Sequence, residues 1–209
     1  MSNIINGFFP GCLNPNTTVG GCIDIFENAW PNSSETITSV EEECKNPESP
    51  VSWWKAETIG QGVNQQARTN VNMCVSHLAS QQDNVIMQNI HNQMNMLLLA
   101  ATVSYTERYN IHGPLFHEPY NLLRYSGGQH YKAHYDGGSD TGRCISALIY
   151  LNNEFEGGEI EFVNFGLKVK PEPGMLILFP SNYAYSHIAH PVSDGTKYAL
   201  VTWIKDLNI

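Results

Sequence analysis

The stretch YKAHYD, residues 131–136, places the imidazole of His134 and the carboxylate of Asp136 two positions apart. In a β-strand, side chains two positions apart point to the same face, so this stretch predicts that His134 and Asp136 project together. Two side chains are only a partial ligand set for a metal ion. The interpretation of the stretch as a metal site therefore requires a third ligand elsewhere in the chain.

The residues around this stretch predict a β-rich core. From Glu118 onward, short β-like runs alternate with turn signals such as Gly127-Gly128 and Pro173-Gly174. Eight short strands joined by turns are typical of a sandwich or jelly roll. The predicted strands lie at residues 120–125, 131–135, 143–151, 158–162, 167–169, 175–179, 183–189 and 198–204.

The N-terminal half is expected to support this core. Apolar side chains recur at helical spacing from Val85, which predicts a helix to about Thr106 with Asp83 as its N-cap. No linker or internal repeat divides the chain. We therefore expect one domain over residues 1–209, in which residues 1–117 provide helical and β support and residues 118–209 form the core with the site.

Other N-terminal segments carry weaker signals. Ile23, Phe26 and Trp30 have the spacing of a short amphipathic helix. Of the adjacent Trp53 and Trp54, we expect one in the core and one at a pocket rim, and the sequence does not say which. Further expectations are a long loop at residues 31–50 and a β-like segment at residues 71–75.

Two histidines in a later predicted strand are candidates for the third ligand. His187 and His190 lie in the segment SHIAHPV, residues 186–192, and the residues alone leave the choice between them open. Two histidines and one carboxylate form the facial triad of non-haem Fe(II) oxygenases, which leaves positions on the metal for a cosubstrate and for oxygen.

The last predicted strand adds a lysine to this group. Lys197, Ala199, Val201 and Trp203 share one face of the strand by alternation. The small side chains at 199 and 201 leave room for a narrow ligand beside Lys197. A buried cation is costly unless it meets an anion, and a dicarboxylate cosubstrate would supply one.

Charge and cysteine content exclude several classes of protein. The net charge of -9 disfavours nucleic acid and anionic membranes as partners. No apolar run is long enough to span a bilayer, and the N-terminus lacks the basic region of a signal peptide. The five cysteines have no Cys-x-x-Cys spacing, which favours free thiols in a reducing cytoplasm over disulfides. The oligomeric state is left open.

The motifs together resemble a known family. Tyr125 stands nine residues before His134, Pro191 stands four residues after His187, and Lys197 stands ten residues after His187. This pattern resembles the iron- and 2-oxoglutarate-dependent dioxygenases, most of all their prolyl 4-hydroxylase-like branch. Residues 143–159 and 169–179 resemble core strands of the same family. The resemblance is strong over about residues 118–205 and loose in the N-terminal half.

The resemblance implies a fold and a set of site residues. The fold would be α+β and mainly β, with a double-stranded β-helix (jelly-roll) core and N-terminal supporting helices. Iron would be held by His134, Asp136 and His187, and His190 would be excluded. Lys197 and Tyr125 would bind the far carboxylate of 2-oxoglutarate. Leu148 and Tyr150 would line its pocket. Arg143 and Trp203 would contact a peptide substrate.

The implied activity is hydroxylation of prolyl residues in a peptide or protein, similar to procollagen-proline 4-dioxygenase. Fe(II) and O2 would take part, 2-oxoglutarate would leave as succinate and CO2, and ascorbate would assist. Lys205 departs from the family pattern, because collagen-type enzymes often have histidine there. The alternatives are the same chemistry on a free amino acid, another side chain or a nucleobase, and a metal-binding jelly-roll module without enzymatic turnover.

Overall fold

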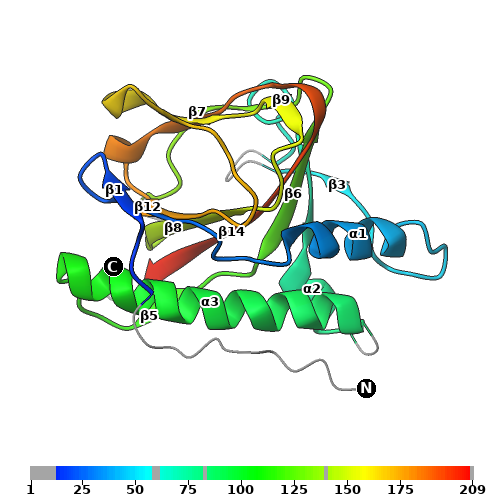
Figure 1. The fold of residues 1–209 in the computed structure, drawn as a ribbon, viewed down its shortest axis with the longest axis horizontal. Coiled ribbons are helices and arrows are strands. Elements are labelled where there is room, and N and C mark those ends of the chain that lie inside the picture. The colour runs from blue at the N-terminus through cyan, green and yellow to red at the C-terminus, as the bar shows by residue number, and fades with distance from the viewer. Residues whose placement is uncertain (1–12, 58–61, 82–83, 139–140, 208–209) are drawn as a thin grey trace.

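The computed structural model describes residues 13–57, 62–81, 84–138 and 141–207. Two antiparallel β-sheets face each other in it, and helices cover the outer side of the larger sheet (Figure 1). The polypeptide therefore has three layers. Apolar side chains fill both the space between the sheets and the space between the larger sheet and the helices.

The larger sheet has ten strands. The main path runs in the order β1 (Thr17–Val19), β2 (Ile23–Phe26), β12 (Leu176–Pro180), β8 (Arg143–Tyr150), β14 (Val192–Asp206), β6 (Asn121–Ser126), β4 (Val71–Cys74) and β3 (Trp54–Lys55). Two further strands, β5 (Leu115–His117) and β9 (Phe155–Gly157), pair with β14. The long strand β14 is therefore the centre of the sheet.

The smaller sheet has four strands, in the order β11 (Leu167–Val169), β10 (Ile160–Phe162), β13 (His187–Ala189) and β7 (Tyr131–His134). It faces β12, β8, β14 and β6 of the larger sheet, and the two sets of four make the jelly roll. The predicted α+β, mainly β fold with a jelly-roll core and N-terminal helices is confirmed. Strand β7, in the second predicted strand segment, pairs with β13, in the seventh.

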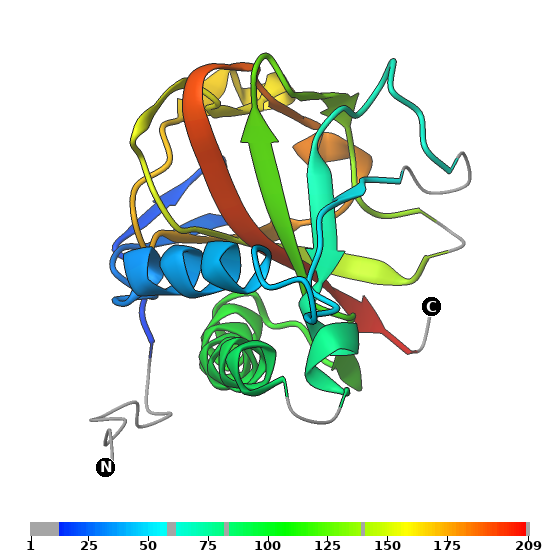
Figure 2. The same cartoon turned by 90° about the vertical axis from the view of Figure 1, so that its right-hand side faces the viewer.

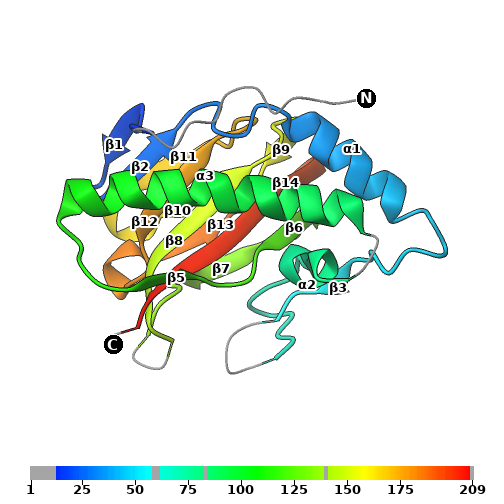
Figure 3. The same cartoon turned by 90° about the horizontal axis from the view of Figure 1, so that it is seen from below.

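The helices lie on the outer side of the larger sheet. They are α1 (Ser33–Glu43), α2 (Val75–Ala79) and α3 (Val85–Tyr109), and two short 3-10 turns, η1 (Val163–Phe165) and η2 (Tyr183–Tyr185), belong to the connections of the smaller sheet. Figure 2 shows α3 nearly end-on below the strands, and Figure 3 shows α3 crossing them. In the described part of the chain, no helix is long and apolar enough to span a membrane.

The long helix was predicted to run from Val85 to about Thr106, and α3 confirms it. The side chain of Asn84 accepts a hydrogen bond from the backbone N–H of Met87 at 3.1 Å, so Asn84 is the N-cap. The predicted cap, Asp83, lies outside the described residues. The apolar stripe of α3 packs on the sheet through Met87, Ile90, Met94, Leu97, Leu98, Ala101 and Tyr105.

The alternation predicted for the last strand is present in β14. Tyr198, Leu200 and Ile204 pack in the layer between the larger sheet and the helices. The intervening residues Ala199 and Val201 face the space between the sheets. The strand itself begins at Val192, six residues earlier than predicted, because the residues before Tyr198 pair with β9 and β6.

The helix predicted over residues 23–30 is wrong. Ile23–Phe26 is strand β2, which pairs with both β1 and β12, and all four of its residues are buried. The polar residue of this strand, Asp24, is fully buried and accepts hydrogen bonds from Thr18 and Tyr109. The helical spacing of Ile23, Phe26 and Trp30 arose by chance.

The loop predicted over residues 31–50 is also wrong, because Ser33–Glu43 forms helix α1. Two of its three buried residues, Ser33 and Thr36, are polar, so the apolar signal at helical spacing is short and consists of Ile37, Val40 and the capping residue Cys44. Tertiary contacts hold it in place. The carboxylate of Glu41 accepts hydrogen bonds from Arg124 at 3.2 Å and from Tyr198 at 2.8 Å.

Two further expectations are now resolved. The strand predicted over residues 183–189 is shorter, since its first part is the turn η2 and only His187–Ala189 is extended. Of the two adjacent tryptophans, Trp53 packs against the core and Trp54 is 69% exposed. Trp54 also lines the larger pocket described below, so it is the tryptophan at the rim.

Gly174 provides a test of this packing. Its φ is +76°, and an added Cβ would lie 2.6 Å from the carbonyl oxygen of Trp30. At Gly127 φ is +55°, with nothing within 4 Å of an added Cβ. Alanine at either position costs about 1–2 kcal/mol for the left-handed backbone. Only Gly174→Ala adds overpacking, of about 1–3 kcal/mol.

In denaturant unfolding, we expect the free energy of unfolding of Gly174→Ala to be lower than that of Gly127→Ala by about 1–3 kcal/mol, the cost of overpacking. Equal unfolding free energies for Gly174→Ala and Gly127→Ala would contradict the close approach of Gly174 to Trp30.

Candidate metal centre

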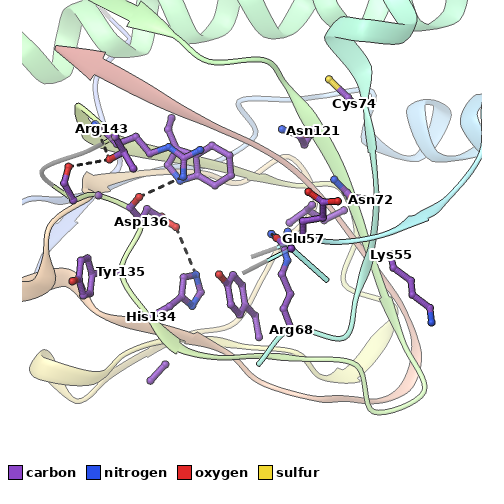
Figure 4. Close-up of a pocket in the computed structure, with 18 of the residues that line it drawn as sticks. Lys55, Glu57, Arg68, Asn72, Cys74, Asn121, His134, Tyr135, Asp136 and Arg143 are labelled. Atoms are coloured by element: carbon purple, nitrogen blue, oxygen red, sulfur yellow. Dashed lines mark hydrogen bonds and ion pairs between the residues drawn. The ribbon is translucent and has the colours of Figure 1, made fainter. Parts of the chain in front are cut away.

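His134, Asp136 and His187 come together at one edge of the smaller sheet. His134 ends β7 and lies opposite His187, the first residue of β13. Nε2 of His134 lies 3.6 Å from Oδ1 of Asp136, and Nε2 of His187 lies 3.7 Å from Oδ2. Figure 4 shows His134 and Asp136 pointing toward each other. One ligand atom from each residue lies within 4.8 Å of the others, a spacing that one metal ion can bridge.

Hydrogen bonds fix the orientation of both imidazole rings. Nδ1 of His134 donates to the carbonyl oxygen of Lys132 at 2.7 Å, and Nδ1 of His187 donates to that of Tyr185 at 3.1 Å. A carbonyl oxygen only accepts, so each neutral ring carries its proton on Nδ1 and leaves the Nε2 lone pair for a metal. Burial and the neighbouring His187 lower the pKa of His134 to about 3, which keeps this ring neutral at physiological pH.

Asp136 contributes a buried negative charge. Burial alone would raise its pKa, but His187, His134 and the hydrogen bond from Ser146 hold the pKa below its ordinary value. The hydroxyl of Ser146 donates to Oδ2 at 2.7 Å. Two imidazole nitrogens and one carboxylate oxygen therefore converge, and this donor set fits the facial triad of a non-haem Fe(II) site.

Lys197 lies between the two sheets and is only 2% exposed. It pairs with Tyr125 across β14 and β6, and its Nζ lies 4.5 Å from the centroid of the Tyr125 ring. The ammonium donates to the carbonyl oxygen of Gly158 at 2.7 Å. Burial lowers the pKa of Lys197 to about 7, with Glu159 opposing the shift. Among the described residues no carboxylate forms an ion pair with Lys197, so an anionic ligand would stabilise it.

A small cavity of about 50 Å³ joins Lys197 to the metal-ligand candidates. Burial raises the pKa of Tyr125 to about 12 and also raises that of Tyr150, so both phenols keep their protons and can donate hydrogen bonds. Besides Lys197 and the three ligand candidates, the cavity is lined by Tyr125, Leu148, Tyr150, Ala199 and Val201.

A larger pocket of about 1000 Å³ opens outside the metal centre and is lined by Arg143 and Trp203. The guanidinium of Arg143 lies 3.7 Å from the centroid of the Trp203 ring. Glu118 accepts two hydrogen bonds from Arg143, at 2.8 and 2.5 Å. It also forms an ion pair with Lys205 at 3.1 Å. These contacts fix a flat, cationic and aromatic surface beside the metal ligands.

Residues 120–205 match the family described as the 2OG-Fe(II) oxygenase superfamily, and this segment contains all three ligand candidates and Lys197. This segment belongs to that superfamily. The resemblance predicted from the motifs is therefore confirmed. The family implies Fe(II) and 2-oxoglutarate, and the donor set and the buried lysine of this chain fit both groups.

Curated relatives of the oxygenase segment include prolyl hydroxylases. The chain is 33% identical over 120 residues to prolyl 4-hydroxylase 13 of Arabidopsis thaliana, covering 44% of each protein. It is 37% identical over 68 residues to human prolyl 3-hydroxylase 2, covering 30% of this chain and 10% of that protein. The chain thus spans less than half the length of these relatives.

Solved structures share the fold over most of the chain. A prolyl hydroxylase from Trichoplax adhaerens, in complex with a peptide fragment of the hypoxia inducible factor oxygen degradation domain, has a TM-score of 0.72 at 18% identity, covering 90% of this chain and 86% of that one. A viral collagen prolyl hydroxylase from Paramecium Bursaria Chlorella virus-1, in complex with 2OG, has a TM-score of 0.62 at 19% identity, covering 90% and 98%. At these identities the structures show the jelly-roll fold of the oxygenase.

Two residues of the oxygenase site were not anticipated from the sequence. The ring of Tyr131 stacks on that of His134, with centroids 3.5 Å apart. Arg68, which is 8% exposed, lies 4.9 Å from the Tyr131 centroid and lines both pockets. Figure 4 shows Arg68 among the lining residues. Tyr131 precedes His134 by three residues and was within the stretch we singled out, but Arg68 comes from the divergent N-terminal half.

His190 does not join the metal centre. Its Nε2 bonds to Oε2 of Glu161 at 2.7 Å, on a surface that also carries Lys168. The strand pairing explains this difference, because it is His187 that lies opposite His134. His91, in α3, bonds to Ser76 at 3.1 Å and also lies apart from the site.

The two histidines provide a matched pair of variants. His187→Ala removes one of three converging donors, so we expect Co(II), used as an oxygen-stable substitute for Fe(II), to bind at least about 100-fold more weakly. His190→Ala removes a surface contact and should leave the affinity unchanged. Calorimetric titration measures both. Weak binding by His190→Ala with normal binding by His187→Ala would reverse the choice of ligand.

Proposed function

We propose that this protein is an Fe(II)- and 2-oxoglutarate-dependent hydroxylase that acts on prolyl residues in a peptide or protein. The observation that carries the chemistry is the buried Lys197. It lacks a carboxylate partner among the described residues, and it shares one small cavity with His134, Asp136 and His187. A cation fixed at that place suits a dicarboxylate that reaches from the lysine to the metal.

In this proposal, each residue of the inner cavity has a physical task. His134, Asp136 and His187 hold the iron, and Lys197 and Tyr125 bind the far carboxylate of 2-oxoglutarate by charge-assisted hydrogen bonds. Leu148 and Tyr150 form walls that exclude water. The bound iron, with 2-oxoglutarate and O2, supplies the oxidation, in which substrate C–H becomes C–OH while 2-oxoglutarate becomes succinate and CO2. Ascorbate is proposed as an accessory reductant by analogy with the family.

The choice of a prolyl substrate is supported by the named relatives and by the larger pocket. The two curated relatives named above are prolyl hydroxylases, and one neighbouring structure was solved with a peptide. The pocket of about 1000 Å³ is large enough for several residues of an extended chain. Arg143 and Trp203 are proposed to contact this peptide, with Arg143 donating to its backbone carbonyl groups and Trp203 packing against the target ring.

Lys205 favours a second candidate within the same chemistry. It stands where collagen-type enzymes often have histidine, and it adds a cation next to Glu118 and Arg143. The second candidate is therefore the same hydroxylation acting on a substrate that is not a collagen-like sequence.

Mass spectrometry of a panel of proline-containing peptides tests the proposal. We expect the mass gain of one oxygen atom on at least one peptide, dependent on Fe(II) and 2-oxoglutarate, with one succinate formed per hydroxylation. Panel members with other side chains in place of proline test the alternative substrates. If the protein bound iron but formed no succinate, the enzymatic proposal would be contradicted and a metal-binding module would be supported.

Lys197 provides a sharper test of cosubstrate binding. Lys197→Met keeps the length of the side chain and removes the charge that pairs with the carboxylate. Losing one partner of a buried charge pair costs ~2 kcal/mol or more, so the KM for 2-oxoglutarate should rise about 30-fold or more. Lys168→Met, on the surface, is the control and should change nothing. An unaltered KM in Lys197→Met would refute the assigned role.

The lowered pKa of Lys197 predicts proton uptake on binding. At a pH of about 8 the free side chain is mostly neutral, and a bound carboxylate stabilises its charged form, so binding should take up close to one proton. At a pH of about 6 the side chain is already charged, and uptake should vanish.

Calorimetry of 2-oxoglutarate binding in two buffers of different ionisation enthalpy measures this uptake. Lys197→Met should show none at either pH. The same uptake in wild type and in Lys197→Met would assign the proton to another group.

A further inference from the structure

Two buried serine hydroxyls form a chain that ends on the carboxylate of Asp136. Ser146, on β8, donates to Oδ2 of Asp136 at 2.7 Å, and its hydroxyl lies 2.8 Å from that of Ser181. Ser146 is fully buried and Ser181 is 1% exposed. The two serines come from opposite sides of the β8–β12 pairing, at positions 35 residues apart in the sequence.

The direction of this chain follows from the number of protons available. An ionised carboxylate only accepts hydrogen bonds, so the single hydroxyl proton of Ser146 goes to Asp136. Ser146 must then accept from Ser181, which donates. Each hydrogen bond polarises the next in such a chain, and the bond that reaches the charge is the strong one.

Ser181 also contacts the metal-binding turn through its backbone. Its carbonyl oxygen accepts from the N–H of Gly137 at 2.7 Å, and its own N–H donates to the carbonyl oxygen of Cys144 at 3.0 Å. A Cβ on Gly137 would lie 3.0 Å from the carbonyl oxygen of Ser181 and 2.9 Å from that of Arg143. The backbone of Ser181 therefore links the turn after His134, at Gly137, to strand β8, at Cys144, and Ser181 stands just before the turn η2 that leads to His187.

We propose that Ser146 and Ser181 are positioning residues that hold the Asp136 carboxylate as a one-oxygen ligand, with Oδ2 engaged by Ser146 and Oδ1 presented to the metal. This inference rests on the metal site of the proposed function. Each oxygen of Asp136 faces a different histidine, Oδ1 toward His134 and Oδ2 toward His187, so a carboxylate free to rotate has both oxygens available to the metal. Binding through both would use a coordination position that 2-oxoglutarate or O2 requires.

A purely structural role for the serines makes a different prediction. Buried hydroxyls need partners, and two serines that only satisfied each other would affect folding stability and leave the metal unaffected. The measurement must therefore report on the metal itself. Affinity for Co(II) and its visible absorption both do so without enzymatic activity, since the absorption bands of Co(II) change with the number of ligands.

The test uses the full chain under oxygen-free conditions, with Co(II) as the probe. We expect Ser146→Ala to bind Co(II) about 10–100-fold more weakly and to show a changed absorption spectrum. Ser181→Ala should give a smaller change in the same direction. Ser181 acts on Asp136 only through Ser146. The double variant Ser146→Ala with Ser181→Ala should therefore bind Co(II) no more weakly than Ser146→Ala alone. Ser33→Ala, a buried serine on α1, is the control and should match wild type.

The outcomes separate this inference from the proposed function. A folded Ser146→Ala that keeps wild-type affinity and spectrum would overturn the inference alone, and so would fully additive effects of the two serines. If wild type and Asp136→Ala bound Co(II) equally, both the inference and the proposed metal site would fail. If Ser146→Ala does not fold, Ser181→Ala serves as the test. Wild-type Co(II) affinity and a wild-type Co(II) spectrum in Ser181→Ala would then overturn the inference.

Discussion

The register between β7 and β13 is the constraint on which the whole site depends. It places His134 opposite His187, and the two-residue step to Asp136 then brings the third donor to the same point. A slip of one residue would turn one histidine to the other face of the sheet. The larger sheet holds this register indirectly, because the connections of β7 and β13 both lead into it. Sheet pairing thus sets the geometry of the donors.

The site concentrates buried charge, and each charge is stabilised in a different way. The carboxylate of Asp136 accepts a hydrogen bond from the Ser146 hydroxyl. Lys197 donates to the carbonyl oxygen of Gly158 and lies over the ring of Tyr125, and among the described residues no carboxylate forms an ion pair with it. A buried cation with so little compensation is an energetic cost to the ligand-free protein. That cost explains why an anionic cosubstrate is expected here. The lysine lies on β14, the central strand, where its backbone pairs with Tyr125 of β6.

The strands of the core and the long helix α3 were largely predictable, whereas strand β2 and helix α1 were not. Turn residues and alternation marked β6, β7, β8 and β11 within one or two residues, since each strand is short and bounded by a tight turn. The segment Ile23–Phe26 was misassigned because it is only four residues long and its apolar residues, with Trp30, also fit a helical spacing. Helix α1 was missed because few of its residues are apolar: Ile37 and Val40 pack on the core, and Glu41 adds polar contacts. In both cases tertiary contacts overruled the local pattern.

The sequence by itself determined the chemistry available to this protein: the residue types His134, Asp136 and Lys197 at spacings that a jelly roll can bring together. It did so because donor type and strand alternation are local properties. Only the tertiary structure decided which partners complete the site, among them Arg68 from the N-terminal half and the hydroxyl of Ser146 behind Asp136. Those contacts join residues far apart in the chain, and no local pattern records them.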